Sequence, residues 1–271
     1  MQVTEQRAEV DGVEVFWRRA VPDAGAAPVV YVHGVPNNAD VWEPFLARTG
    51  GIALDLPGFG RSAKPVGFDY SIAGYDRFLE SFLRVAGVER FSLVMHDWGV
   101  VALATAQRQR DRLDRLVLFT GVPLLPGYHW HRIARVWRTP FLGELSMGFS
   151  SRRAFKQISK EANATPGPLP DDLLDSVWAH FDHGTQRAIL RLYRASPPAV
   201  LEAAGSGLEG IDRPALVLWA GADPYTGAEF GQAYADALGG RAQLEIAENA
   251  GHWSWLDRPE QVDRAVAFLR G

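Results

Sequence analysis

The chain has 271 residues, of which 47% are hydrophobic and 22% charged, so it is long enough for one large domain with a substantial core. Its formal charge of −4 gives no reason to expect nucleic acid or an anionic membrane as a partner. The absence of cysteine excludes disulfides and thiolate metal sites. Because no apolar run could span a bilayer and the first residues lack the pattern of a signal peptide, we expect a cytoplasmic protein.

Short runs rich in β-branched residues alternate with amphipathic stretches, which predicts a mostly parallel sheet covered by helices. In chain order, the predicted strands cover residues 13–17, 28–32, 52–54, 91–95, 116–119, 215–219 and 242–246. The predicted helices cover residues 72–86, 100–110, 226–238 and 259–269. The last of them has an acidic start with Pro259 in its first turn. We expect Trp17, Trp42 and Trp219 to pack in the core.

One region interrupts the alternation of strands and helices. Residues 123–213 contain no convincing strand pattern but several helical patterns rich in arginine and aromatic residues. An insertion of this size between two strands predicts a helical cap over one edge of the sheet, so we divide the chain into a first core part (1–122), a cap (123–213) and a second core part (214–271). Within the cap, residues 165–172 predict a turn-rich connector that ends in a helix N-cap.

The motifs that suggest chemistry follow the predicted strands, and ligands of open α/β sheets bind outside the carboxyl ends of the strands. Four such loops carry distinctive residues, namely HGVP at 33–36, HDWG at 96–99, GADP at 221–224 and NAGH at 249–252. HDWG joins a buried-strand pattern to a helix of small residues and leaves room only for a sharp turn. A charge buried there is costly unless it is paired or used. With Gly99 two residues after Asp97, this is the pattern of a nucleophile elbow with aspartate in place of serine.

On these motifs, the chain resembles the α/β-hydrolases of the epoxide hydrolase and haloalkane dehalogenase group. The resemblance covers nearly the whole length, with HGVP, DLPGFGRS at 55–62, HDWG, GADP and NAGHWSWLDRPEQV at 249–262 in the expected order. It implies an α/β-hydrolase fold with a mostly parallel eight-stranded sheet and an inserted helical cap. The family order of nucleophile, acid and histidine is met by Asp97, Asp223 and His252.

A carboxylate nucleophile can displace a leaving group at a saturated carbon, which would give an alkyl ester on Asp97. His252 would then activate water as a general base, with Asp223 orienting it. The backbone N–H groups of Val35 and Trp98 are the candidate donors of an oxyanion hole. Each catalytic residue also has a structural interpretation, as a helix N-cap, a turn or a core histidine, but the order of the motifs favours catalysis.

The cap residues bear on the leaving group. An epoxide leaves an alkoxide, which needs a proton or a strong O–H hydrogen bond, whereas a halide needs N–H donors but no proton. The epoxide hydrolases that the chain resembles use two cap tyrosines, and Tyr193 matches the second by its local Tyr-Arg pattern. Ile133 and Trp137 stand where the first is expected, so Trp130, Trp137 or His131 is a candidate to replace it.

The residues near the predicted nucleophile bear on the same choice. The dehalogenases that the chain resembles usually have Asn or Glu before the proline of the first loop, where Val35 removes one halide donor. Met95 is more typical of dehalogenases, and Trp98 occurs in both groups. We therefore expect an epoxide hydrolase that opens a hydrophobic, aromatic small molecule to a diol, with a haloalkane dehalogenase as the alternative. A non-hydrolytic natural-product enzyme or a small-molecule binding protein on the same fold stays open as a further alternative.

The expected partners are a small hydrophobic substrate and water, with a homodimer left open. No cofactor is expected, and no metal, because the histidines lack metal-binding spacing. His33 and His96 are expected to hold their loops by hydrogen bonds. The candidate substrate contacts are His33, Pro36, Trp130, His131, Trp137, Trp178 and Trp253.

Overall fold

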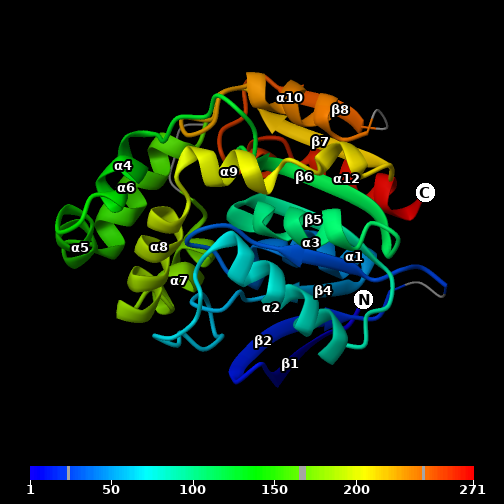
Figure 1. The fold of residues 1–271 in the computed structure, drawn as a ribbon, viewed down its shortest axis with the longest axis horizontal. Coiled ribbons are helices and arrows are strands. Elements are labelled where there is room, and N and C mark those ends of the chain that lie inside the picture. The colour runs from blue at the N-terminus through cyan, green and yellow to red at the C-terminus, as the bar shows by residue number, and fades with distance from the viewer. Residues whose placement is uncertain (23–24, 165–168, 240–241) are drawn as a thin grey trace.

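A computed structural model describes residues 1–22, 25–164, 169–239 and 242–271. In these residues, eight strands form one sheet in the order β1-β2-β4-β3-β5-β6-β7-β8 (Figure 1). The strands are β1 (Val3–Val10), β2 (Val13–Ala20), β3 (Val29–Val32), β4 (Gly51–Leu54), β5 (Phe91–Asp97), β6 (Leu113–Gly121), β7 (Ala215–Ala220) and β8 (Ala242–Ala247). The β1–β2 and β2–β4 pairs are antiparallel and the other five pairs are parallel. The predicted mostly parallel eight-stranded sheet is confirmed.

Each face of the sheet carries its own hydrophobic cluster, because successive side chains of a strand point to opposite faces. On β3, Val30 and Val32 belong to one cluster, while Val29 and Tyr31 belong to the other. The first face is covered by α2 (Ile72–Val85), α3 (Ala102–Arg108) and α10 (Glu229–Ala237). The second face is covered by α1 (Glu43–Thr49), α11 (Ser254–Asp257) and α12 (Glu260–Arg270).

The predicted core strands and helices are observed with shifted ends, but the core also contains elements that were not predicted, among them β1, α1 and α11. Trp17, Trp42 and Trp219 are buried, as expected. Strand β1 was not predicted, because its segment VTEQRAEV is mostly polar and lies at an exposed edge without a clear apolar face. The predicted helix 100–110 is replaced by a 3₁₀ helix, η2 (Trp98–Val101), followed by α3. In the part of the chain that the structure describes, no helix is long and apolar enough to cross a membrane.

Between β6 and β7 the described residues form helices and no strand. They are α4 (Arg132–Arg138), α5 (Leu142–Gly148), α6 (Arg152–Ala162), α7 (Asp171–Ala179), α8 (His183–Ala195), α9 (Pro198–Ala204) and the 3₁₀ helix η3 (Leu208–Gly210). Helices α4 to α8 lie to one side of the sheet (Figure 1), whereas α9 and η3 pack against the core. Residues 165–168 of the predicted connector lie outside the described residues. The predicted N-cap at its end is not formed by a side chain, because Pro170 occupies that position and Asp171 starts the helix.

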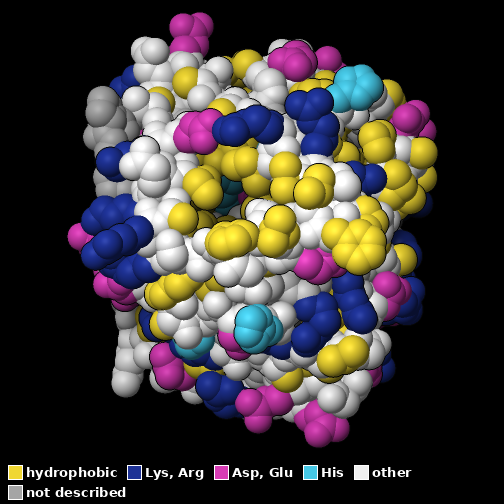
Figure 2. Space-filling view, turned by 90° about the vertical axis from the view of Figure 1, so that its left-hand side faces the viewer, with side chains coloured by type: hydrophobic (Ala, Val, Ile, Leu, Met, Phe, Trp, Pro, Cys, Tyr) yellow, Lys and Arg dark blue, Asp and Glu magenta, His cyan; other side chains and the backbone are white. Residues whose placement is uncertain are grey.

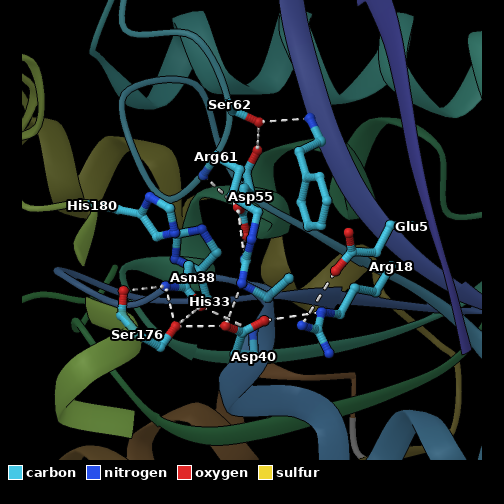
Figure 3. Close-up of polar contacts among 12 residues, drawn as sticks. Glu5, Arg18, His33, Asn38, Asp40, Asp55, Arg61, Ser62, Ser176 and His180 are labelled. Carbon is cyan, nitrogen blue, oxygen red and sulfur yellow. Dashed lines mark hydrogen bonds and ion pairs between the residues drawn. The ribbon is translucent and has the colours of Figure 1, made fainter. Parts of the chain in front are cut away.

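A polar network joins the cap to the core, with Asp40 of η1 (Ala39–Trp42) at its centre (Figure 3). The Asp40 carboxylate accepts hydrogen bonds from Arg61 at 2.6 Å and from Ser176 of α7 at 2.5 Å, and it pairs with Arg18 at 2.9 Å. Asn38 also donates to the Ser176 hydroxyl, at 2.9 Å. Burial raises the pKa of Asp40, but the Arg61 and Ser176 hydrogen bonds and the charge of Arg18 outweigh it, so the pKa lies below its ordinary value. This carboxylate therefore stays ionised and binds α7 to the core.

We predict that Asp40→Ala destabilises the fold by about 3 kcal/mol, because Arg18 and Arg61 lose a carboxylate in a largely buried site. Ser176→Ala should cost about 1 kcal/mol, since it removes only hydrogen bonds. Urea unfolding of the two variants measures the difference. Equal losses of unfolding free energy would contradict the central place given to the carboxylate.

Candidate active site

The predicted sharp turn is present at the end of β5. Asp97 is the last residue of β5 and the N-cap of η2, and its φ of 52° lies in a region that residues other than glycine rarely adopt. The backbone at Gly99 passes so close to β3 that a Cβ there would lie 2.2 Å from the carbonyl oxygen of Val32. The turn therefore requires glycine at this position, and it raises Asp97 above the carboxyl end of the sheet.

The two oxygens of the Asp97 carboxylate have different surroundings. Oδ1 accepts the backbone N–H of Val35 at 2.6 Å, and the backbone N–H of Trp98 also hydrogen-bonds the carboxylate. Oδ2 lies 3.8 Å from Nε2 of His252. Burial raises the pKa of Asp97 above its ordinary value, although the charge of His252 and the two N–H groups act in the opposite direction. Oδ1 is thus held by the backbone N–H of Val35, and Oδ2 faces the histidine.

His252 is held by groups from the core and from the cap. Its Nδ1 lies 2.7 Å from Oδ2 of Asp223, whose other oxygen accepts the backbone N–H groups of Tyr225 and Thr226. The backbone N–H of His252 donates to the carbonyl of Ala162, the last residue of α6, at 2.7 Å. Burial lowers the pKa of His252, but the charge and hydrogen bond of Asp223 and the charge of Asp97 raise it above its ordinary value. With Nδ1–H bound to Asp223, Nε2 is directed toward Asp97.

The two other histidines near the turn hold backbone, as expected. Nε2 of His96 lies 2.9 Å from the carbonyl oxygen of His252. Nδ1 of His33 lies 2.7 Å from the carbonyl oxygen of Gly34, and its Nε2 accepts the N–H of Leu56 at 3.0 Å. Burial lowers the pKa of His33 to about 4. Since both ring nitrogens of His33 are used and the residue is fully buried, the expectation that it contacts substrate is wrong.

A cavity of about 390 Å³ opens between the elbow and the cap. Of the sequence-predicted residues, its wall includes Asp97, His252, Val35, Pro36, Tyr193, His131, Trp137, Trp178 and Trp253. Asp223 lies behind His252. Trp130 was also expected in the wall, but it packs behind it: its ring stacks on Trp98 at 5.6 Å, and its N–H donates to the carbonyl of Ser196 at 3.0 Å.

Tyr193 and His131 come together on the cap side of this cavity, with ring centres 6.5 Å apart. Burial raises the pKa of Tyr193 well above its ordinary value, and the charge of Asp97 raises it further. His131 is the N-cap of α4, where its Nδ1 accepts the N–H of Ala134 at 3.4 Å. Burial and the charge of His252 lower the pKa of His131 to about 4. A neutral His131 with Nδ1 used as an acceptor carries its proton on Nε2.

Several residues of the wall were not predicted from the sequence. Tyr225 packs its ring against His252 at 5.1 Å and against His131 at 4.8 Å. Its position directly after the GADP motif is a signal that could have identified it. The others come mainly from the cap helices, whose inward faces no motif marks, and they include Met147, Phe149, Phe155, Phe181 and Ile189. No cluster of three metal-binding side chains occurs in the described ranges.

The sheet, the elbow and the inserted helices define a hydrolase architecture, and comparison with known proteins agrees. The profile of the Alpha/beta hydrolase family matches residues 29–265, so the chain belongs to this family.

Relatives of two kinds match almost the whole chain. A haloalkane dehalogenase of Bradyrhizobium diazoefficiens is 26% identical over 98% of this chain and 94% of its own. Epoxide hydrolase 3 of Xenopus tropicalis is 26% identical over 89% of this chain and 71% of its own. The solved structures of haloalkane dehalogenase DbeA from Bradyrhizobium elkani (TM-score 0.82, 21% identity) and of epoxide hydrolase CorEH (TM-score 0.84, 18% identity) each cover 99% of both chains. The family and the fold are thereby shown. Because the relatives include both dehalogenases and an epoxide hydrolase, they do not decide whether the leaving group is a halide or an alkoxide.

We predict that Asp223→Asn lowers the pKa of His252, because it removes the negative charge that raises it. In the unchanged protein, the His252 ring should titrate above pH 6.5, and in the variant the midpoint should move to lower pH. Histidine NMR titration measures this without a substrate. His180, which lies near Arg61 and Lys64, is the internal control and should keep its midpoint. An unchanged midpoint for His252 would contradict the assigned pairing.

Proposed function

We propose that the protein is an epoxide hydrolase that acts through an alkyl ester on Asp97. The observation that carries the proposal is the pair of neutral hydrogen-bond donors, Tyr193 and His131, in the cavity wall that also contains Asp97. An alkoxide that develops beside them can accept an O–H and an N–H hydrogen bond. A neutral imidazole is suited to this role because it can donate an N–H hydrogen bond while the ring stays uncharged.

In the first step, Oδ2 of Asp97 bonds to an epoxide carbon, and the carbon–oxygen bond of the ring breaks. The epoxide oxygen keeps the electron pair and takes the hydroxyl proton of Tyr193, while His131 holds the oxygen by its N–H. The surroundings of the carboxylate fit this division, since the backbone N–H of Val35 holds Oδ1 and not Oδ2.

In the second step, Nε2 of His252 takes a proton from water, and the hydroxide adds to the carbonyl carbon of the ester. The oxyanion then forms on Oδ1, beside the N–H of Val35, and the N–H of Trp98 is the second backbone donor to the Asp97 side chain. The bond between the carbonyl carbon and Oδ2 then breaks, and Oδ2 leaves with the substrate as the second hydroxyl oxygen of the diol, taking the proton from His252. The last proton of the water returns from the Asp97 carboxyl group to Tyr193 through solvent.

Two observations favour an alkoxide over a halide. The indole N–H of Trp98 is buried close to the Tyr193 hydroxyl, without a well-formed hydrogen bond, and Trp98 lies outside the cavity wall. Val35 has no side-chain donor to offer in the first loop. A haloalkane dehalogenase that uses the same Asp97, His252 and Asp223 is the second candidate, supported by the dehalogenase relatives. A binding protein without turnover would have no use for the His252–Asp223 pair.

The substrate that we propose is a small hydrophobic molecule with an aromatic ring, and water is the second reactant. Trp178 and Phe181 stand stacked in the cavity wall, with ring centres 5.6 Å apart and planes inclined by 18°. Trp137 and Trp253 add further aromatic surface. Flat faces of this kind favour ring systems through stacking in addition to burial.

We predict that a panel of aryl and alkyl epoxides gives diol, while matched bromo- and chloroalkanes give no free halide. Tyr193→Phe and His131→Phe should each slow diol formation about 100-fold or more, because each removes one donor to the alkoxide. Trp137→Phe is the matched control, since it changes an aromatic residue of the same wall without an assigned part in the chemistry. It should slow the reaction less than about tenfold. Halide release that survives Tyr193→Phe would instead establish the dehalogenase.

We also predict that His252→Gln accumulates the ester, because alkylation of Asp97 does not need the general base whereas hydrolysis does. Mass spectrometry of this variant after incubation with substrate should show the chain heavier by one substrate molecule. The double variant with Asp97→Ala is the control and should stay unmodified. Turnover by the unchanged protein without any adduct on His252→Gln would rule out the covalent route.

A further inference from the structure

The cap exposes an apolar surface beside the mouth of the cavity. On and next to α5, Phe141 is 88% exposed, Phe149 77%, Leu145 57% and Leu142 53%. We call these four residues the cap apolar surface. It is continuous with the cavity, because Phe149 also lines the wall. Figure 2 looks onto the cap side of the molecule, where apolar side chains border a hollow. A contiguous exposed surface of this kind marks a site of interaction.

Phe141 shows that the fold itself does not need this surface. Its backbone has φ 65°, in the left-handed region that a bulky side chain adopts only under strain. Its side chain is almost fully exposed, so packing within the chain does little to offset the strain of its backbone. A strained backbone together with an exposed aromatic ring indicates a contact made outside the chain.

The three helices α4 to α6, of which α5 carries most of the cap apolar surface, have an excess of positive charge. Helices α4 to α6, residues 132–162, carry seven Lys and Arg against two Glu, although the whole chain is negative. Both glutamates are already paired, Glu144 with Arg194 and Glu161 with Arg132. Arg135, Arg153 and Lys160 have no ion-pair partner within the described ranges. No membrane partner was expected because the net charge of the whole chain is negative. That net charge conceals the local excess of positive charge on the cap.

We propose that the cap apolar surface and its basic border bind an anionic lipid bilayer, with α5 at the level of the headgroups. Exposed Phe and Leu beside Lys and Arg are the composition of interfacial membrane-binding segments. A second copy of the chain is a less suitable partner for this surface. In a twofold contact, the unpaired cations of one copy would face the same cations of the other copy, and the like charges would repel. The mouth of the cavity then opens at the bilayer, where hydrophobic substrates dissolve, and this last consequence rests on the proposed function.

Co-sedimentation of the full chain with lipid vesicles tests the proposal. Vesicles with about a third of phosphatidylglycerol should bind the protein, vesicles of phosphatidylcholine alone should not, and added salt should weaken binding. Replacing Arg135 or Arg153 by Gln should weaken binding about fivefold for each charge removed. The double variant Val21→Ser/Val85→Ser, which changes exposed apolar residues of the core, is the matched control and should bind normally.

Phe141→Gly separates binding from folding. Glycine adopts positive φ without strain, so this variant should keep or raise the unfolding free energy while its vesicle binding falls at least about tenfold. The double variant Phe141→Gly/Leu145→Ser should keep full turnover of a water-soluble epoxide, because neither residue lines the cavity.

Three results would overturn the proposal: no binding to anionic vesicles, binding that Phe141→Gly leaves unchanged, or self-association that Phe141→Gly abolishes. Because the vesicle assay uses no substrate, its outcome does not depend on whether the leaving group is an alkoxide or a halide.

Discussion

The structure depends on the placement of one buried carboxylate at a strained turn. Asp97 keeps a positive φ because β5, β3 and η2 approach one another closely, with a glycine at the tightest contact, Gly99. The loop after β3 comes equally close, since a Cβ on Gly34 would lie 2.3 Å from the Asp97 side chain. That proximity brings the N–H of Val35 onto the carboxylate. The donors are therefore in place before any charge moves, which is the condition for electrostatic stabilisation without reorganisation.

The position of Asp97 gives its two carboxylate oxygens different surroundings. It also brings groups of the core and groups of the cap to the same carboxylate. The core supplies the Val35 N–H on Oδ1, and Asp223 fixes the tautomer of His252. The cap closes the cavity from the other side with Tyr193 and His131, and it also contacts the His252 backbone through the carbonyl of Ala162. A shift of α6 would therefore act on the histidine directly. This contact links the position of the cap to the geometry of the proposed hydrolytic step.

The sequence predicts the residues of the strand ends better than the residues of the cap. Asp97, Asp223 and His252 each follow a strand in a short motif, and the parallel sheet brings such loops to one edge, so local patterns suffice. Cap residues meet the cavity only through the packing of one helix on another, which no local pattern encodes. For this reason Trp130 was misplaced, although it lies only one residue before His131, and Phe155 was missed.

The polar contacts of the cap are distributed unevenly, and this asymmetry bears on how a substrate enters. Its α7 and α8 side is bound to the core by Ser176 on Asp40 and by Asp182 on Lys64 at 2.8 Å. The α5 side instead presents exposed Phe141 and Leu145 to the surroundings, next to the open wall of the cavity. Entry on the bound side would require breaking ion pairs in a partly buried site, whereas entry past α5 requires only the displacement of apolar side chains. Three exposed apolar residues also line the cavity, namely Val136 of α4, Phe149 directly after α5 and Ile158 of α6. A route past this side of the cap would keep the proposed hydrophobic substrate in apolar contact from the surface to the cavity that contains Asp97.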